Sequence, residues 1–212
     1  MADPSQMFVQ MIIRPPRSEY NDPGTFEKSV KVGDKDVMFK GEAFEVYNGK
    51  GEKLVCHFVE PKNDADRPSP DMPCIIYMHG NASNKTEGLS YWEKVVAQGV
   101  NLCTFDFSGC GKSEGDWVTL GHKEQSDLKS VIEYLNEHKR VSSIGLWGRS
   151  MGAVTSILYM ASEENVGTYN CAVLDSGFCS LSYLMNSLAG QMGIPPDFVM
   201  MLTPMITMAL QQ

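Results

Sequence analysis

Several features of other protein classes are missing from this sequence. No apolar run approaches the roughly 18 residues that a membrane span needs, and the N-terminus lacks the basic segment and apolar core of a signal peptide. Basic residues are few, with 18 lysines and arginines against 26 aspartates and glutamates, and the formal net charge is −8. Because an acidic surface repels phosphate backbones, nucleic-acid binding is disfavoured. We expect a cytoplasmic protein with no membrane span and no nucleic-acid partner.

The six cysteines include no C-x-x-C pair, so the spacing typical of zinc sites and redox-active disulfides is also missing. Three of them, Cys74, Cys103 and Cys171, lie inside apolar runs, where a thiol behaves as a small buried hydrophobe. We therefore expect reduced, structural cysteines.

The sequence contains enough hydrophobic residues to form the core of one globular domain, since they make up 42% of its 212 residues. Residues 1–28 are polar and proline-rich, which is typical of an extended arm that packs on the domain or trails from it. We expect residues 29–212 to form the domain.

The first part of that domain predicts antiparallel strands. Short segments rich in aromatic and β-branched residues occur at Val37–Lys40, Ala43–Tyr47 and Leu54–Glu60. The last two are separated by Asn48-Gly49, a strong signal for a β-hairpin.

After Pro73 the pattern changes to continuous apolar runs that alternate with helical periodicity. The expected strands are Cys74–Met78, Asn101–Phe105, Ser143–Trp147 and Cys171–Leu174, and the expected helices are Glu87–Gln98, Glu124–Glu137 and Ala153–Ala161. Runs that are apolar on both faces favour strands buried in a parallel sheet. The sequence thus predicts an α/β fold, a mostly parallel doubly wound sheet preceded by an antiparallel hairpin.

A G-x-S-x-G motif lies between one of these strands and the helix that follows it. Gly148-Arg149-Ser150-Met151-Gly152 follows the strand that ends at Trp147. This context is the one that a nucleophile elbow requires, because the serine sits on a strained turn between two glycines that let strand and helix approach closely. The alternative is an N-capping serine. We predict that Ser150 is a nucleophile and that the Met151 N–H, at a helix N-terminus, is an oxyanion donor.

A second glycine-rich segment, residues 106–113, invites comparison with a nucleotide-binding P-loop because it ends in Gly111-Lys112-Ser113. The position that needs glycine in a P-loop is occupied by Asp106, whose negative charge would lie where phosphate should bind. We therefore interpret the segment as a D-x-x-G-x-G-x-S loop that lines the site of Ser150.

Three motifs occur in order: His79-Gly80-Asn81, residues 106–115 and residues 145–153, and residues 173–178 follow them. Together they resemble the serine-aminopeptidase-like branch of the α/β-hydrolase superfamily over roughly residues 35–190. The resemblance implies a serine hydrolase that cleaves a peptide, ester or thioester through an acyl-enzyme, without metal or cofactor.

The loop after the Cys74–Met78 strand supplies the second oxyanion N–H in such hydrolases. We assign this N–H to Asn81, with Ala82 as the alternative. His79 precedes the donor and is expected to order the loop through hydrogen bonds. With Gly80, Asp106 and Arg149 it is predicted to line the site.

The histidine that should activate Ser150 is the missing catalytic part. In the family, the acid and then the histidine follow the serine, whereas His57, His79, His122 and His138 all precede Ser150. We expect all four to be structural or solvated. Asp175 is a candidate acid but is better interpreted as structural.

The end of the sequence suggests a missing part of the sheet. The segments Leu181–Leu188 and Asp197–Leu210 are predicted helices, and the second is apolar on nearly all sides and rich in methionine. We expect the domain to be truncated before its last strands, with the base, and with it the acid, encoded beyond Gln212. An uncovered sheet edge invites a protein partner. The alternative function is therefore an inactive interaction or structural protein in a larger assembly.

Overall fold

A computed structural model describes residues 13–191 of the chain and, beyond them, residues 193, 197, 199, 200, 204 and 208. The predicted helix over Asp197–Leu210 lies mostly outside the described residues. No helix in the described part of the chain is long and apolar enough to cross a bilayer.

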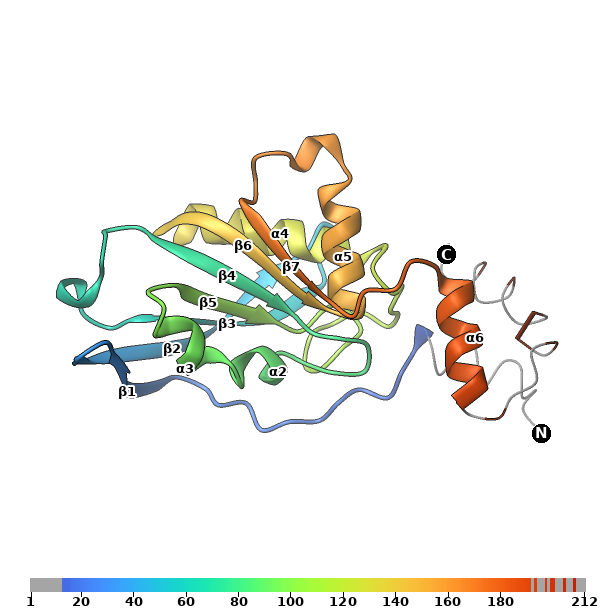
Figure 1. Ribbon diagram of the computed structural model, residues 1–212, viewed down its shortest axis with the longest axis horizontal. Coiled ribbons are helices and arrows are strands. Elements are labelled where there is room, and N and C mark those ends of the chain that lie inside the picture. The colour runs from blue at the N-terminus through green and yellow to red at the C-terminus, as the bar shows by residue number, and fades with distance from the viewer. Residues whose placement is uncertain are drawn as a thin grey trace.

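A twisted sheet of seven strands forms the centre of the fold, in the order β1-β2-β3-β5-β4-β6-β7 (Figure 1). The strands are β1 (Phe26–Val32), β2 (Lys35–Tyr47), β3 (Lys53–Pro61), β4 (Met72–Met78), β5 (Asn101–Phe105), β6 (Val141–Arg149) and β7 (Cys171–Asp175). Strands β4, β5, β6 and β7 run parallel, whereas β1, β2 and β3 are antiparallel to their neighbours. This is the predicted α/β-hydrolase architecture.

The antiparallel part is larger than the predicted hairpin. The two expected strands Val37–Lys40 and Ala43–Tyr47 are one continuous strand, β2, and the predicted turn at Asn48 joins it to β3. The arm was predicted to extend to residue 28, but β1 already begins at Phe26. The sequence did not reveal strand β1 because Lys28 interrupts the apolar row that Phe26, Val30 and Val32 otherwise form on one face.

The helices follow the predictions except in one segment. Helix α4 (Glu124–His138), helix α5 (Met151–Met160) and helix α6 (Leu181–Gln191) match expected helices. The predicted helix over Glu87–Gln98 is instead two short helices, α2 (Thr86–Leu89) and α3 (Trp92–Val96). Two 3-10 turns, η1 (Asp64–Asp66) and η2 (Glu163–Asn165), complete the elements.

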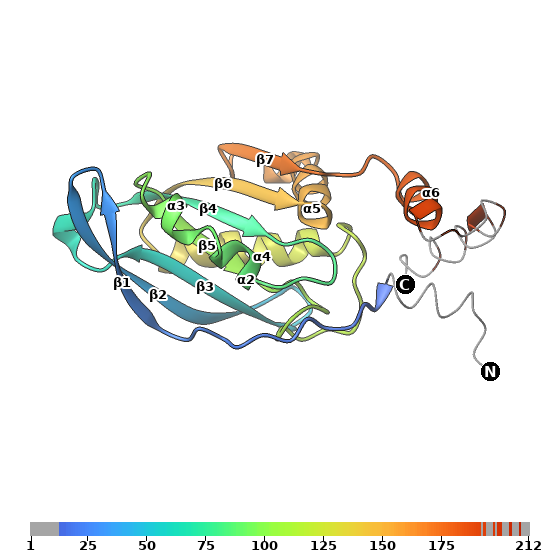
Figure 2. The ribbon, with the colours of Figure 1, turned by 60° about the horizontal axis from the view of Figure 1, so that its bottom comes forward.

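Helices cover the sheet on both faces (Figure 2). On one face, α4 and α5 supply Leu128, Val131, Ile132 and Tyr159 to a core that includes Phe58, Cys103 and Leu146. On the other face, α2 and α3 supply Leu89, Val95 and Val96 to a second core with Val59, Tyr77 and Leu102. The interior strand β5 is buried along its whole length, as its apolar sequence predicts.

Strand β7 departs from the expectation of a buried strand. It forms one edge of the described sheet, and the side chains of Val173 and Leu174 are 56% and 44% exposed. Cys171, predicted to be buried, is exposed on this strand, whereas Cys74 and Cys103 are buried as expected. An apolar run indicates a strand but does not show whether a neighbour covers it.

Candidate active site

The three predicted motifs meet at the carboxyl edge of the parallel strands. In the ladder between β4 and β6, Tyr77 pairs with Trp147 and Met78 with Gly148, so both strands end at the same level. On its other side, β4 pairs with β5, with Tyr77 opposite Thr104. The loops that begin at His79, Asp106 and Ser150 therefore leave neighbouring strands at one edge, where ligands bind in open α/β sheets.

Ser150 occupies a sharp turn between β6 and α5. Its backbone angles are φ 53° and ψ −110°, a conformation that residues other than glycine rarely adopt. The Ser150 N–H donates to the carbonyl of Asp175 at 2.7 Å, which ties the turn to the end of β7. The strand–turn–helix context expected of a nucleophile elbow is present, and the N-cap alternative loses support because the side chain makes no capping hydrogen bond.

The two glycines of the motif allow this turn to pack tightly. A β-carbon on Gly148 would lie 2.2 Å from the carbonyl oxygen of Gly152, and one on Gly152 would lie 2.2 Å from that of Met78. Both neighbours are backbone atoms that cannot move aside. The start of α5 is thus pressed against the end of β4, beside the loop that carries Asn81.

The loop that carries Asn81 has an irregular backbone closed by local hydrogen bonds. Ala82 has a positive φ of 57°, and its N–H donates to the side-chain Oδ1 of Asn81 at 3.0 Å. The Ser83 N–H donates to the Gly80 carbonyl at 3.2 Å and closes the turn. The Met151 side chain is fully buried at the start of α5.

His79 is buried and has both ring nitrogens engaged. Nε2 accepts the Phe107 N–H at 3.2 Å, and Nδ1 lies 2.7 Å from the Gly80 carbonyl, to which it must donate. These partners require a neutral ring protonated on Nδ1. Burial, the largest cause, also lowers the pKa of His79. His79 therefore orders the loops as expected and has no free nitrogen for a proton from Ser150.

Arg149 forms an ion pair with Glu87 beside the elbow. Nε and Nη2 both donate to this carboxylate, the latter at 2.7 Å, and Glu87 also accepts from Tyr77 and Ser83. Burial raises the pKa of Glu87, but these hydrogen bonds outweigh it and lower the pKa to about 2. The Arg149 guanidinium packs over Gly80, where a β-carbon would lie 2.7 Å from Nη2. Glu87 largely neutralises the charge of Arg149. The Arg149 guanidinium holds the Asn81 loop in place through its contact with Gly80.

Asp106 is fully buried and holds two loops together. Its Oδ1 accepts the Lys85 N–H at 2.6 Å, and its Oδ2 accepts the Lys112 N–H at 2.8 Å. A β-carbon on Gly111 would lie 2.3 Å from Oδ2, so the carboxylate fills the space within the turn. The N–H group of Lys112 that a phosphate would need is already occupied. The P-loop alternative is wrong, and Asp106 acts beneath the loops rather than on their surface.

The other three histidines lie away from the elbow. His57 is buried on β3 between the sheet and Phe26, and burial with the nearby Lys85 lowers its pKa to about 4. His138 is exposed at the end of α4, where its ring stacks on Tyr134. His122 is exposed and lines a groove with Tyr159 of α5. Within the described part of the chain, no hydrogen bond joins any of the three to Ser150.

Sequence reasoning missed the supporting residues of this site. Lys85, Glu87 and Asn84 hold the loop of Asn81, and Arg17 and Tyr20 reach the site from the arm. No local pattern signals these roles, because the partners of Arg17 and Tyr20 lie more than 80 positions away. Among the described residues, no group of three histidine, cysteine or acidic side chains is arranged to hold a metal ion.

Comparison with protein families identifies the group to which this architecture belongs. Residues 50–194 match the model of the X-Pro dipeptidyl-peptidase family, S15. The chain belongs to this family. The match contains the Asn81 loop, the Asp106 loop and the Ser150 elbow, and it places the chain in the α/β-hydrolase superfamily.

Curated relatives match part of this chain. The uncharacterised protein YqkD of Bacillus subtilis is 36% identical over 126 residues, which are 59% of this chain and 39% of YqkD. Protein R595 of Acanthamoeba polyphaga mimivirus is 30% identical over 122 residues, 54% of this chain and 41% of R595. The lysophosphatidylserine lipase ABHD12 of Danio rerio is 28% identical over 82 residues, 38% of this chain and 21% of that lipase. The chain therefore spans less than half of these relatives.

Solved structures share the fold. The esterase Pf2001 of Pyrococcus furiosus superposes with a TM-score of 0.65 and 24% identity, covering 91% of this chain and 66% of the esterase. Est1E of Butyrivibrio proteoclasticus, solved with ferulic acid bound, superposes with a TM-score of 0.56 and 23% identity, covering 67% of this chain and 56% of Est1E. The chain has the fold of a hydrolase.

Proposed function

We propose that the chain carries the nucleophile and the oxyanion hole of a serine hydrolase. The observation that carries the proposal is the backbone of Ser150, held at φ 53° between β6 and α5. Such strain persists only where the surrounding structure enforces it, and here Gly148 and Gly152 permit packing that no larger residue allows. A turn that only capped α5 would need neither the strain nor the contact with β4.

In the proposed reaction, Ser150 Oγ attacks the carbonyl carbon of an acyl substrate while a base removes the hydroxyl proton. The negative charge on the former carbonyl oxygen is stabilised by the backbone N–H groups of Met151 and Asn81. The C–O, C–S or C–N bond then breaks, and the leaving group departs with the proton from the base. Water, deprotonated by the same base, hydrolyses the acyl-enzyme and releases Ser150.

We propose that the base is a histidine encoded beyond Gln212, together with its acid. The four histidines of this chain are engaged, buried elsewhere or solvated, and curated relatives are more than twice as long as the matched segment. Asp175 stays a weaker candidate for the acid, because its carboxylate accepts from Ser176 and its carbonyl from Ser150.

The substrate class is an ester, thioester or peptide with an uncharged acyl part. Arg149 is the cation nearest to the nucleophile in sequence, and its charge is paired with Glu87. The names of the relatives include a peptidase family, esterases and a lipase, which supports acyl transfer without choosing the leaving group.

A fluorophosphonate probe tests the proposal, because it forms a covalent bond only with an activated serine. The protein expressed from its complete coding sequence is incubated with the probe, and labelling is located by mass spectrometry. We expect modification of Ser150 and complete loss of labelling in Ser150→Ala. Ser176→Ala is the matched control, because Ser176 also has a positive φ, of 55°, at the same sheet edge. Ser176 itself should not be labelled, so this variant should keep the full labelling of Ser150.

The second candidate is an inactive α/β-hydrolase-like interaction protein. It is favoured by the exposed apolar side chains of β7, which form a sheet edge that a partner could cover. This candidate predicts binding without turnover. Absence of label on Ser150 in folded, complete protein would decide for it.

A further inference from the structure

The arm, residues 13–24 of the structure, crosses the loops of the candidate site instead of trailing from the domain. Arg17 donates through Nη1 to the carbonyls of Cys110 and Gly111, both at 3.3 Å, and to that of Ser113. Through Nη2 it also donates to the carbonyl of Gly115. One guanidinium thus binds four carbonyls of the Asp106 loop, which fits the fork of donors that arginine presents.

The next contacts of the arm reach the Asn81 loop. The Asn84 side chain donates to Ser18 Oγ at 2.9 Å, and Lys85 Nζ forms an ion pair with Asp22 at 2.8 Å. The Lys85 side chain is fully buried, so Asp22 supplies the counter-charge that a buried ammonium requires.

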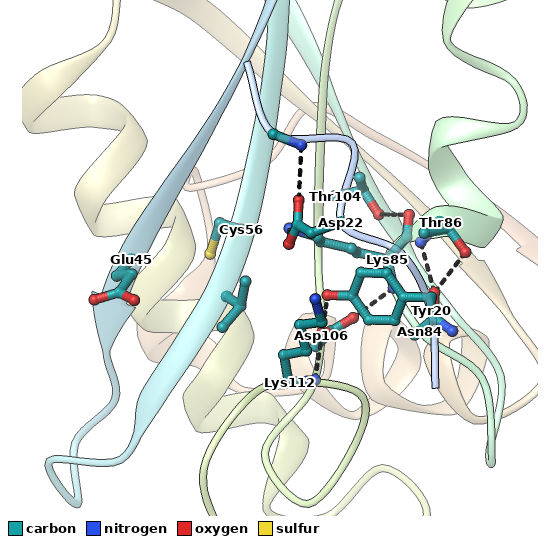
Figure 3. Close-up of polar contacts among 12 residues, drawn as sticks. Tyr20, Asp22, Glu45, Cys56, Asn84, Lys85, Thr86, Thr104, Asp106 and Lys112 are labelled. Carbon is teal, nitrogen blue, oxygen red and sulfur yellow. Dashed lines mark hydrogen bonds and ion pairs between the residues drawn. The ribbon is translucent and has the colours of Figure 1, made fainter. Parts of the chain in front are cut away.

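Tyr20 joins the two loops at Asp106 (Figure 3). Its hydroxyl donates to Oδ2 of Asp106 at 2.6 Å, and its ring lies under the ammonium groups of Lys85 and Lys112, 5.7 and 4.9 Å from the ring centroid. Burial and the hydrogen bond to Asp106 raise the pKa of Tyr20, so the phenol stays a donor. The carboxylate of Asp106 thereby binds the arm and both loops at once.

The path from this junction to Asn81 is short and rigid. Asp106 fixes the N–H of Lys85, and the Lys85 carbonyl accepts the Thr104 hydroxyl at 3.1 Å. Asn84 precedes Lys85 directly, and the turn that follows Gly80 is closed by Ser83. We therefore expect a shift of Lys85 to reach the backbone N–H of Asn81, four residues earlier.

We propose that Tyr20 and Asp22 are positioning residues for the oxyanion hole. They act through Asp106 and Lys85 to hold the Asn81 N–H where the oxyanion forms. This inference rests on the proposed function. Residues 13–24 precede residues 50–194, which match the family model. The inference therefore gives this preceding segment a role in the reaction that we propose for the matched residues.

The expected kinetic signature follows from when the oxyanion exists. The charge develops only in the transition state, so a displaced donor lowers kcat and leaves KM unchanged. A displacement of about 1 Å costs up to about 100-fold in rate. A purely structural contact would instead reduce the fraction of folded protein and leave the rate per folded molecule unaltered.

Two variants test the inference in the complete protein. Tyr20→Phe removes one hydroxyl and keeps the ring under the two lysines, and Asp22→Asn removes the counter-charge of Lys85. Arg14→Ala is the matched control, because Arg14 lies on the same arm and, among the described residues, its side chain pairs with the exposed Asp116 and Trp117. Each protein is assayed for kcat and KM on a p-nitrophenyl ester, for the rate of fluorophosphonate labelling, and for amide hydrogen exchange in residues 79–86.

We expect Tyr20→Phe to lower kcat and the labelling rate about 10-fold with KM unchanged, and to speed exchange in residues 79–86. Asp22→Asn should act in the same direction, and Arg14→Ala should match the unmodified protein. If Asp22→Asn does not fold, Tyr20→Phe decides alone. Equal kcat per folded molecule and equal exchange in Tyr20→Phe and the unmodified protein overturn the inference. Failure of Ser150 to label in the unmodified protein overturns the proposed function first, and the inference with it.

Discussion

The two sides of the elbow differ in how they are held. On the side of β4 and β5, the Asn81 and Asp106 loops are tied to each other and to the arm by buried carboxylates, each with several donors. On the side of β7, the elbow is joined to the exposed Asp175 by the end of the β6–β7 ladder and by the hydrogen bond from the Ser150 N–H, and apolar side chains stay exposed.

The difference separates the proposed oxyanion donors, which the described residues hold rigidly, from the proposed base and acid. The groups proposed to stabilise the oxyanion lie on the braced side. The base and acid of the family would follow β7, on the side that is open here. A rigid oxyanion hole costs no reorganisation when the charge forms, which is the usual source of its large effect.

The largest effect is expected at Gly152. Gly152→Ala would place a β-carbon 2.2 Å from the Met78 carbonyl oxygen, so either β4 or α5 must move. We expect a loss of at least about 3 kcal/mol in the free energy of unfolding, measured by urea denaturation.

Gly190→Ala in α6 is the control, because a β-carbon there meets no atom within 4 Å. It should stabilise the helix by up to about 1 kcal/mol. A Gly152→Ala protein as stable as the unmodified one would show that the braced side is looser than the contacts indicate.

Asp127 gives the next effect. Its carboxylate, buried in α4, accepts from Asn48 and from both the N–H and the hydroxyl of Ser108, behind the Asp106 loop. Burial raises its pKa to about 6, although these hydrogen bonds oppose the rise. The folded state therefore binds an extra proton between about pH 4 and pH 6, and stability falls as pH rises through that window.

Asp127→Asn removes this titration. At pH 4 the folded carboxyl group is already protonated on one oxygen, so the variant should lose no more than about 1 kcal/mol there, from the second N–H that its amide places among the donors. The deficit should shrink as pH rises to 7, as measured by denaturation at a series of pH values. A deficit that stays constant or grows with pH would contradict the raised pKa.

Glu87 has the opposite pH dependence. Its folded pKa of about 2 lies below the ordinary value of 4.5, so its stabilisation is complete above about pH 5 and is lost as pH falls toward 2. The partner Arg149 is 40% exposed, so screening reduces the effect to about 1–2 kcal/mol. Glu87→Gln should lose this amount at pH 7 and converge with the unmodified protein near pH 2.

The control is Glu93→Gln on α3, which removes an exposed ion pair with Lys28 of β1. It should change stability by no more than about 0.5 kcal/mol at any pH. If the two variants behave alike, Glu87 is not a brace of the Asn81 loop.

Much of the fold and of the site could be predicted because the signals are local. The β5 run predicts its own burial, and the glycines around Ser150 predict a tight turn wherever the strand and helix lie. The braces could not be predicted, because Tyr20 and Asp106 are ordinary residues until folding brings them within 2.6 Å.

The same limit explains the error at Cys171. Cys171 and Cys103 both lie in short apolar runs of the sequence. Cys103, however, lies on β5, which has a neighbouring strand on each side. Cys171 lies on β7, which pairs with β6 alone among the described strands. Burial depends on that second neighbour, which no feature of the strand itself specifies.

The smallest expected effect follows from this pair of cysteines. Cys171→Ser should change stability by less than about 0.5 kcal/mol, since the thiol is already exposed. Cys103→Ser puts a hydroxyl into the core and should cost about 1–3 kcal/mol. Burial also raises the pKa of Cys103 to about 12, so its thiolate is unavailable. In folded protein a thiol reagent such as dithiobis-nitrobenzoate should modify Cys171 and spare Cys103. Protection of Cys171 in the complete protein, with reactivity restored in residues 1–212 alone, would show that further sequence covers β7 and completes the open side.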